Sequence, residues 1–300
     1  MILLGDDDVR QALTATEAVA LMRSALLEHH RSSLVSPARL GADLGAGGLM
    51  FTAGRHRGHR YGFRVYGTFT QPTEQVTVVF DDQTGAVSAV ITGAELGDRR
   101  TGALGGVAVD LLARPEAAIL GVIGTGRQAW TQVWAAAAVR SFTHIRVYGR
   151  DADRRRAFAT RCGQELGMSA TAVARPIDAV DGADVIVLGT TSATPVIEDS
   201  WVAPGAHVTT VGPKTVTAHE CPLELVARAE PVVTDSLAQL RAYGAPAIVA
   251  NDRVVSLGAI AAGSAPGRRS ATAVTLYVST GLAGTEIIFA GRVVDATDRG

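Results

Sequence analysis

The stretch that most constrains the fold of this chain is residues 117–129, which read AAILGVIGTGRQA. Ala118–Ile123 is a short, continuous apolar run, and such runs form strands that are buried on both faces of a sheet. A glycine-rich turn follows directly, and Arg127–Val139 is rich in helix-forming residues. The order of strand, glycine turn and helix predicts a βα unit of the kind that holds a phosphate group.

The glycine turn has the spacing of a dinucleotide-binding motif. Gly124 permits the tight turn, Gly126 lets a pyrophosphate approach the backbone, and Ala129 lets the helix lie close to the strand. The start of the helix adds free N–H groups and a partial positive charge. Glycine turns after strands are common, so the alternative is an ordinary βα turn, but the flanking strand and helix favour a dinucleotide. The predicted cofactor site includes Gly124, Thr125, Gly126, Arg127, Gln128 and Ala129.

The composition indicates a globular protein and excludes two classes of partner. Hydrophobic residues make up 47% of the 300 residues and charged residues 19%, which allows a large core. The net charge is −1 and, apart from Arg154–Arg156, the basic residues are scattered, so we expect no nucleic-acid partner. No apolar run reaches membrane-spanning length, and the acidic N-terminal residues do not resemble a signal peptide. Cys162 and Cys221 form no disulfide or metal pattern. We therefore expect a cytoplasmic protein with neither a membrane partner nor a metal site.

The first third of the chain predicts an α+β unit with an antiparallel sheet. Thr14–Glu17 fits a capping box before a helix. Residues 63–69 and 75–80 alternate in hydrophobicity, and DQTG at 82–85 is a turn-forming sequence. Residues 34–54 are glycine-rich and irregular, apart from a short possible strand at 49–51. Residues 95–113 predict a helix dense in small residues, which Arg114-Pro115 ends.

From residue 115 onward, apolar strands alternate with helices, which predicts a parallel, doubly wound sheet. Val232–Asp235 is the last clear strand, and residues 270–290 read mainly as a helix. We thus predict an α/β fold with two domains. Residues 115–269 form a Rossmann-type dinucleotide-binding domain, and residues 1–114 with 270–300 form an α+β domain that the C-terminal helix completes.

Blocks of residues along nearly the whole chain resemble the ornithine cyclodeaminase/mu-crystallin family. They are Arg39, Met50, FDDQTG at 80–85, RTGA at 100–103, LARP at 112–115, GTGRQA at 124–129, GADV at 182–185, PGAHV at 204–208, Asp235-Ser236 and GLA at 281–283. The resemblance implies a homodimer whose first domain binds substrate and mediates dimerisation. It also implies a nicotinamide cofactor that faces a small amino or imino acid. Family members include cyclodeaminases, amino-acid dehydrogenases, ketimine reductases and a thyroid-hormone-binding crystallin.

Arg39, Arg64 and Arg100 suit a substrate with a carboxylate, because a guanidinium group binds a carboxylate through two parallel hydrogen bonds. Arg100 lies in the helix dense in small residues, where a long charged side chain has no packing role. The alternative for each arginine alone is a surface cation. We assign all three to substrate binding.

Two positions depart from the family pattern. The chain has Arg64 where the resemblance implies a lysine that assists proton transfer, and Pro213-Lys214 where it implies a catalytic aspartate. Arginine hardly ever releases its proton, so Arg64 suits a carboxylate clamp better than an acid or base. Lys214 is the only lysine among the 28 lysines and arginines, and it follows a predicted parallel strand, where doubly wound folds bind ligands. We predict that Lys214 is the catalytic acid/base and Arg64 the clamp beside it; the alternative is a solvated Lys214.

The end of the second strand of the predicted nucleotide domain indicates which cofactor binds. Enzymes that use NAD usually carry an acidic residue there, which holds the ribose hydroxyls. The chain has Tyr148-Gly149-Arg150 at this point and Asp151 slightly later. Because Arg150 suits a 2′-phosphate, we predict NADP, with NAD as the alternative. We also assign Gly149, Arg150, Thr190 and Thr191 to the cofactor site.

These residues, taken with what the resemblance implies, favour an NAD(P)-dependent oxidoreductase that acts on a small amino or imino acid. Hydride would transfer at a C=N or C–N carbon while the arginines hold the carboxylate. The first alternative is an ornithine cyclodeaminase-type lyase, which reoxidises its cofactor within each turnover; the missing lysine and aspartate argue against it. The second alternative is a non-catalytic, crystallin-like protein that binds a nucleotide or other ligand.

Overall fold

The computed structural model describes residues 1–71 and 73–297. The chain divides into two compact units: Met1–Arg100 with the C-terminal segment from Gly281, and Thr101–Thr280. These limits differ from the predicted domain limits at 114/115 and 269/270, and the assignment of a function to each domain stays a prediction. In the described part of the chain, no helix has both the length and the apolar character needed to cross a membrane.

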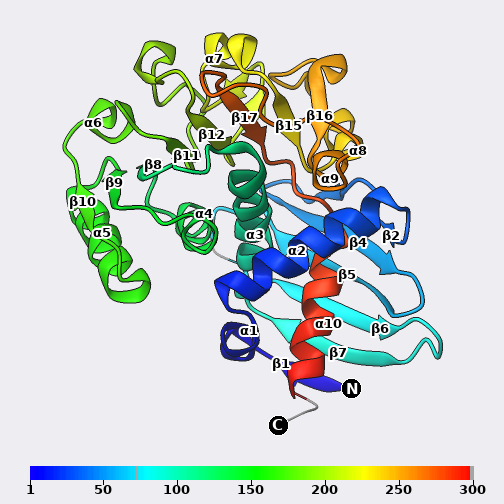
Figure 1. The fold of residues 1–300 in the computed structure, drawn as a ribbon. Coiled ribbons are helices and arrows are strands. Elements are labelled where there is room, and N and C mark those ends of the chain that lie inside the picture. Colours follow the sequence, from blue (N-terminus) through cyan, green and yellow to red (C-terminus); the bar gives the residue numbers. More distant parts are fainter. Residues whose placement is uncertain (72, 298–300) are drawn as a thin grey trace. The chain divides into compact units, whose positions relative to one another are not determined.

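The first unit contains a seven-stranded mixed sheet (Figure 1). Its order is β1-β7-β6-β5-β4-β2, with β3 paired to β4. β1 pairs in parallel with β7, and the remaining pairs are antiparallel. The strands are β1 (Ile2–Leu4), β2 (Leu34–Val35), β3 (Leu40–Asp43), β4 (Gly48–His56), β5 (Arg60–Gly67), β6 (Val76–Asp81) and β7 (Val87–Thr92). The segment that the sequence predicted as irregular therefore contains β2, β3 and most of β4, and the strand predicted at 49–51 lies within β4.

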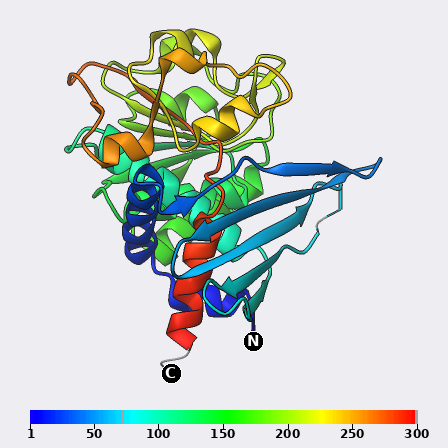
Figure 2. The same ribbon diagram turned by 90° about the vertical axis from the view of Figure 1, so that its right-hand side faces the viewer.

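Four helices belong to this unit in whole or in part. They are α1 (Asp6–Ala12), α2 (Ala15–His30), α3 (Glu95–Leu112), which continues into the second unit, and α10 (Thr285–Thr297). The predicted capping box at the start of α2 is confirmed, because the Thr14 side chain accepts from the Glu17 amide. α10 packs on β4, β5, β6 and β7, and Figure 2 shows it against one face of the sheet. A Cβ on Gly62 of β5 would lie 2.1 Å from the Val78 carbonyl oxygen and 3.0 Å from Cδ1 of Ile287 on α10, so the backbone leaves no room for a side chain there.

The second unit contains an eight-stranded, wholly parallel sheet, which confirms the predicted fold class. Its order is β10-β9-β8-β11-β12-β17-β15-β16. Alternate residues of β11 face two different apolar cores: Val185 and Val187 contribute to one, and Ile186 and Leu188 to the other. The strands are β8 (Ile119–Ile123), β9 (His144–Tyr148), β10 (Ala170–Ala172), β11 (Val185–Leu188), β12 (His207–Thr210), β15 (Val232–Thr234), β16 (Val254–Ser256) and β17 (Thr275–Val278).

Helices connect most of these strands. They are α4 (Arg127–Ala137), α5 (Ala152–Leu166), α6 (Pro176–Val180), α7 (Leu223–Arg228), α8 (Leu237–Arg241) and α9 (Leu257–Ala261), with 3₁₀ turns at Asp199–Trp201 and Asn251–Arg253. A small antiparallel hairpin of β13 (Lys214–Thr215) and β14 (Ala218–His219) follows β12.

The C-terminal part of the sequence prediction is wrong. Val232–Asp235 is not the last strand, because β16 and β17 follow it, and residues 270–290 are not mainly a helix. β17 is fully buried and pairs with both β12 and β15. Its sequence, TLYV, is rich in β-forming residues. Gly281 and Gly284 then adopt φ angles of +86° and +81°, which a helix does not allow, so the helix begins only after them.

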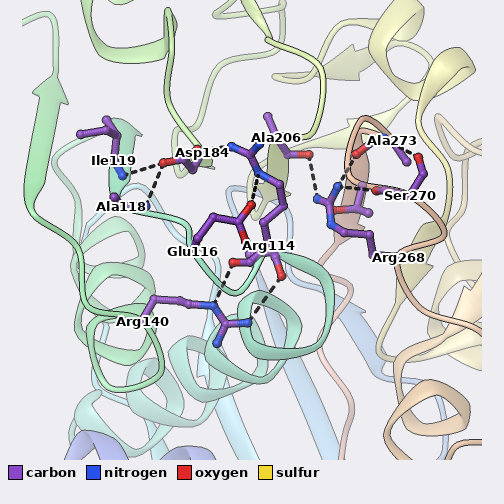
Figure 3. Close-up of polar contacts among 12 residues, drawn as sticks. Arg114, Glu116, Ala118, Ile119, Arg140, Asp184, Ala206, Arg268, Ser270 and Ala273 are labelled. Carbon is purple, nitrogen blue, oxygen red and sulfur yellow. Dashed lines mark hydrogen bonds and ion pairs between the residues drawn. The ribbon is translucent and has the colours of Figure 1, made fainter.

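Arginine side chains form hydrogen bonds and ion pairs along the amino-terminal edge of the parallel sheet (Figure 3). Asp184, just before β11, pairs with Arg114 and accepts from the Ala118 and Ile119 amides at 2.8 and 2.9 Å. Arg268 donates to backbone carbonyl oxygens and to the Thr275 hydroxyl at 3.2 Å. Ligands of doubly wound folds bind at the opposite, carboxyl edge. This arginine network therefore stabilises the sheet and does not belong to the candidate site.

Candidate active site

The turn between β8 and α4 leaves its backbone accessible. Gly124 has a φ angle of +119°, and a Cβ on it would lie 2.3 Å from the carbonyl oxygen of Gly189. Gly126 is the N-cap of α4, and a Cβ there would meet nothing within 4 Å. Its N-cap, Gly126, has no side chain that could cap the helix, and the start of a helix is suited to an anion. The residues present thus fit the pyrophosphate of a dinucleotide.

The turn lies at the switch point of the sheet, where ligands of doubly wound folds bind. β8 has β9 on one side and β11 on the other. Gly189, which follows β11, packs on the first turn of α4, and a Cβ on it would lie 3.0 Å from Cβ of Ala129. Of the other predicted cofactor residues here, Thr125 and Gln128 are half-buried and Arg127 is exposed.

Two charged residues follow β9: Arg150 and Asp151. Gly149 packs on Thr125, since a Cβ on Gly149 would lie 2.7 Å from Cγ2 of Thr125. Arg150 is exposed. The Asp151 carboxylate caps α5 by accepting from the Asp153 and Arg154 amides, both at 2.9 Å. These backbone hydrogen bonds, that of Arg154 above all, hold the pKa of Asp151 below its usual range.

Glu220 is a buried carboxylate that was not predicted from the sequence. It accepts hydrogen bonds from residues that follow or end β11 and β12. It accepts from the amide and hydroxyl of Thr190, both at 2.7 Å, and from the Thr210 hydroxyl at 2.9 Å. The amides of Val211 and Gly212 also donate to it. Thr190, assigned to the cofactor site, therefore already donates both of its protons to Glu220. The other residue assigned here, Thr191, is exposed.

Lys214 lies on β13, just past the carboxyl end of β12, and it is not solvated. Its side chain is buried, with 8% exposed. The Nζ atom donates to the Val211 carbonyl oxygen at 3.1 Å and lies 6.0 Å from the centre of the Tyr243 ring. A buried lysine at this edge of a parallel sheet is suited to proton transfer.

Arg64 lies on β5 in the first unit, with 6% exposed. Its Nη1 donates to Oε1 of Gln75 at 2.7 Å, and its guanidinium carbon lies 4.6 Å from the centre of the Tyr66 ring. Gly97 on α3 leaves room for this group, since a Cβ there would lie 2.0 Å from Nη1. Burial and the neighbouring Arg100 lower the pKa of Arg64 to about 10, so Arg64 remains a cation at neutral pH.

The other two predicted arginines lie in the same cluster. Nη1 of Arg39 donates to the Tyr66 hydroxyl at 3.3 Å. A Cβ on Gly281 would lie 3.5 Å from Nη1 of Arg100 and 3.7 Å from Nη1 of Arg39, so both side chains reach this glycine. Arg100 is only 3% exposed, and its Nε and Nη1 find no acceptor among the described residues. Because buried donors are rarely left unpaired, this group is suited to an anionic ligand. We call Arg39, Arg64 and Arg100 the arginine cluster.

A second carboxylate missed from the sequence, Glu286 on α10, accompanies the arginine cluster. It is fully buried. Burial acts to raise the pKa of Glu286, but Arg100 and Arg64 outweigh that effect and hold the pKa below its usual range. The sequence holds one sign of this buried carboxylate: Glu286 is the acidic residue within the apolar run TEIIFA. In the described chain, no group of His, Cys, Asp and Glu residues could hold a metal ion.

Comparison with known proteins shows the same architecture elsewhere. A Delta(1)-pyrroline-2-carboxylate reductase from Bacillus cereus is 35% identical over 75% of this chain and 72% of that protein. The structure of Thermococcus litoralis Delta(1)-pyrroline-2-carboxylate reductase with NADH and L-proline has a TM-score of 0.91 at 26% identity, covering 100% of this chain and 98% of that one. An archaeal alanine dehydrogenase dimer with bound NAD has a TM-score of 0.90 at 25% identity, covering 100% and 97%.

A family model also matches most of the chain. The model of the ornithine cyclodeaminase/mu-crystallin family matches residues 48–300. The alignment with a putative dehydrogenase of Rhizobium meliloti covers 66% of that relative's length. This chain belongs to the ornithine cyclodeaminase/mu-crystallin family.

Proposed function

We propose that this protein is an NAD(P)-dependent oxidoreductase that reduces the C=N bond of a small imino acid, or oxidises the corresponding amino acid. One observation carries the proposal: the buried Arg100 guanidinium has two nitrogens, Nε and Nη1, with no acceptor in the part of the chain that the structure describes. The same chain holds a glycine turn with room for a dinucleotide. The relatives support this chemistry, since one is a pyrroline carboxylate reductase and another an alanine dehydrogenase. In the reductive direction the imine carbon gains a hydride and the nitrogen a proton.

The chain's own residues bind and orient both reactants. Gly124, Gly126 and the start of α4 would hold the pyrophosphate, and the nicotinamide, when bound, supplies or accepts the hydride. The arginine cluster holds the substrate carboxylate, with Arg100 donating from the N–H groups that have no acceptor among the described residues. Burial of Arg64 and Arg100 strengthens these charge-assisted hydrogen bonds.

Lys214 supplies the proton in this proposal, as the acid in reduction and the base in oxidation. We expect Lys214→Met to lower kcat by about 100-fold, in the range usual for loss of a general acid–base residue. Steady-state kinetics would show this, with little change in the dissociation constant of NADPH. Lys214→Arg keeps the charge but not the proton transfer, so it should not restore activity. Unchanged turnover in Lys214→Met would contradict the assignment.

We propose NADP as the preferred cofactor, although the structures of relatives contain NADH and NAD. Arg150 is exposed at the end of β9, and the carboxylate next to it, Asp151, already caps α5. We expect Arg150→Ala to weaken NADPH binding about tenfold, through loss of a charge-assisted hydrogen bond, and to leave NADH binding nearly unchanged. Fluorescence titration would measure both affinities. Arg156→Ala, which removes an exposed cation of α5, is the control; tighter binding of NADH than NADPH to the wild type would refute the preference.

A panel of imino, amino and keto acids, followed by nicotinamide absorbance and ammonia release, tests the function. Net change in the reduced cofactor supports the oxidoreductase. Ammonia release without net change would establish the cyclodeaminase-type lyase instead. Nucleotide binding with neither signal would leave a non-catalytic binding protein.

We further propose that the protein is a homodimer, as the archaeal alanine dehydrogenase is a dimer. Sedimentation of the purified protein would test this, and a monomer at micromolar concentration would contradict it.

A further inference from the structure

Tyr66 on β5 contacts two members of the arginine cluster, and it was not predicted from the sequence as a site residue. It follows Arg64 by two positions on the same strand, so both side chains lie on one face of the sheet. Arg64 is buried, whereas Tyr66 and Arg39 are half-buried. A single side chain can therefore act on two of the three arginines.

The Tyr66 ring packs against the Arg64 guanidinium. The guanidinium carbon lies 4.6 Å from the ring centre, within the range of a cation–π contact. Nη1 of Arg64 also donates to Oε1 of Gln75 at 2.7 Å. A Cβ on Gly97 would lie 2.0 Å from the same nitrogen, so the backbone of α3 approaches it closely. These three contacts restrict the guanidinium.

The contacts of Arg64 suit an arginine better than a lysine. A guanidinium is planar and stacks on a ring while its N–H groups donate in fixed directions, whereas an ammonium is a compact point charge. The chain has Arg64 where its resemblance to the family implies a lysine. Tyr66 and Gln75 are thus partners that fit the residue present in this chain.

The Tyr66 hydroxyl contacts the second arginine. Nη1 of Arg39 donates to this hydroxyl at 3.3 Å. Arg39 lies between β2 and β3, in a segment that belongs to no helix or strand. An arginine that is already ordered loses less conformational freedom when a carboxylate binds. Contact with Tyr66 therefore prepares Arg39 for a ligand.

We propose that Tyr66 is a positioning residue for the substrate carboxylate: its ring holds Arg64, and its hydroxyl holds Arg39, in the geometry that binds the carboxylate. This inference rests on the proposed function, because it concerns the same carboxylate. Tyr66 acts through the two guanidinium groups. Since these hold the carboxylate in the ground state and in the transition state alike, Tyr66→Phe should raise KM and leave kcat within about twofold.

Binding of propionate, a carboxylate without a reacting nitrogen, tests the inference without turnover. A ligand-observed NMR titration gives its dissociation constant, with the protein saturated with the nicotinamide nucleotide that it prefers. Tyr66→Phe keeps the ring and removes the hydroxyl, so we expect propionate to bind about fivefold more weakly. Tyr66→Leu removes the ring as well and should weaken binding by at least about 20-fold. Propionamide has the same shape without the charge, and its binding should respond to neither variant.

A double-mutant cycle with Arg39→Met distinguishes positioning from a general effect on packing. Because Tyr66 acts partly through Arg39, Arg39→Met should weaken propionate binding about fivefold less in the Tyr66→Phe background than in the wild type. Additive effects of the two substitutions would refute the positioning role. Tyr61→Phe is the matched control: it removes a hydroxyl from the same strand, where the Tyr61 ring stacks on Phe80 with ring centres 5.0 Å apart. It should leave propionate binding unchanged.

The outcomes separate this inference from the proposed function. A wild type without nicotinamide turnover, whose propionate binding responds to the variants as expected, would refute the function and support the role of Tyr66. Turnover together with unchanged propionate binding in Tyr66→Phe would refute only the role of Tyr66. A wild type that binds propionate no more tightly than propionamide would refute that role without any variant. Should Tyr66→Leu lose its thermal unfolding transition, Tyr66→Phe and the cycle still decide the inference.

Discussion

Replacement of Arg100 by methionine is expected to lower kcat/KM for the amino or imino acid by about 100- to 1,000-fold. The variant removes a guanidinium group whose Nε and Nη1 have no acceptor among the described residues, so the lost interaction is that with the substrate carboxylate. A charge-assisted pair of hydrogen bonds contributes about 1.5–3 kcal/mol, and a substrate charge left unpaired in a buried site adds to the loss. The loss of transition-state binding follows directly from the kcat/KM ratio.

Arg99→Met is the matched control for this prediction. Arg99 is the preceding residue on α3, but its guanidinium pairs with Glu95 and donates to the Leu13 carbonyl oxygen, outside the arginine cluster. We expect it to keep most of the activity. NADPH binding by Arg100→Met should also persist, which shows that the variant is folded. Equal losses of activity in the two variants would argue against a direct contact between Arg100 and substrate.

Replacement of Gly126 by valine is expected to weaken nucleotide binding by about 100-fold while the protein stays folded. A Cβ at this position would meet no atom of the described residues within 4 Å, so the folded chain has room for a Cβ there. The φ angle of −86° is also ordinary for residues other than glycine. The clash therefore arises only with a phosphate that approaches the start of α4 closely.

Gly244→Val provides the comparison for Gly126→Val. Gly244 also lies in the second unit, and a Cβ on it would likewise meet nothing within 4 Å. Fluorescence titration with NADPH and NADH should show wild-type affinity for Gly244→Val and weak binding for Gly126→Val, with similar unfolding temperatures for both. Undiminished binding by Gly126→Val would mean that the dinucleotide does not use this turn.

The parallel sheet was predictable from the sequence because its strands are short apolar runs between amphipathic helices. β17 was not, because its four residues lie within a long apolar tail, where periodicity does not separate a buried strand from a helix. The positive φ angles of Gly281 and Gly284 exclude a continuous helix here, and these angles are known only from the structure. β2, β3 and the full length of β4 were missed for a related reason, since glycines mask their alternation.

Arg100 could be selected as a candidate from the sequence because a long cation in a helix dense in small residues is unusual. The carboxylates could not. Glu220 and Glu286 acquire their roles from segments distant in the sequence: Glu220 accepts from Thr190 and Thr210, and Glu286 lies close enough to Arg64 for that charge to lower its pKa. Such partners depend on tertiary packing, which neither spacing nor periodicity encodes.

Net hydride transfer to the carbon of a C=N bond is the step that defines the proposed function. Its most direct test is turnover with reduced cofactor deuterated at the transferable position, together with the best imino acid of the panel. We expect one deuterium on the α-carbon of the amino-acid product for each oxidised cofactor formed. A product without deuterium, or ammonia release with no oxidised cofactor, would contradict it.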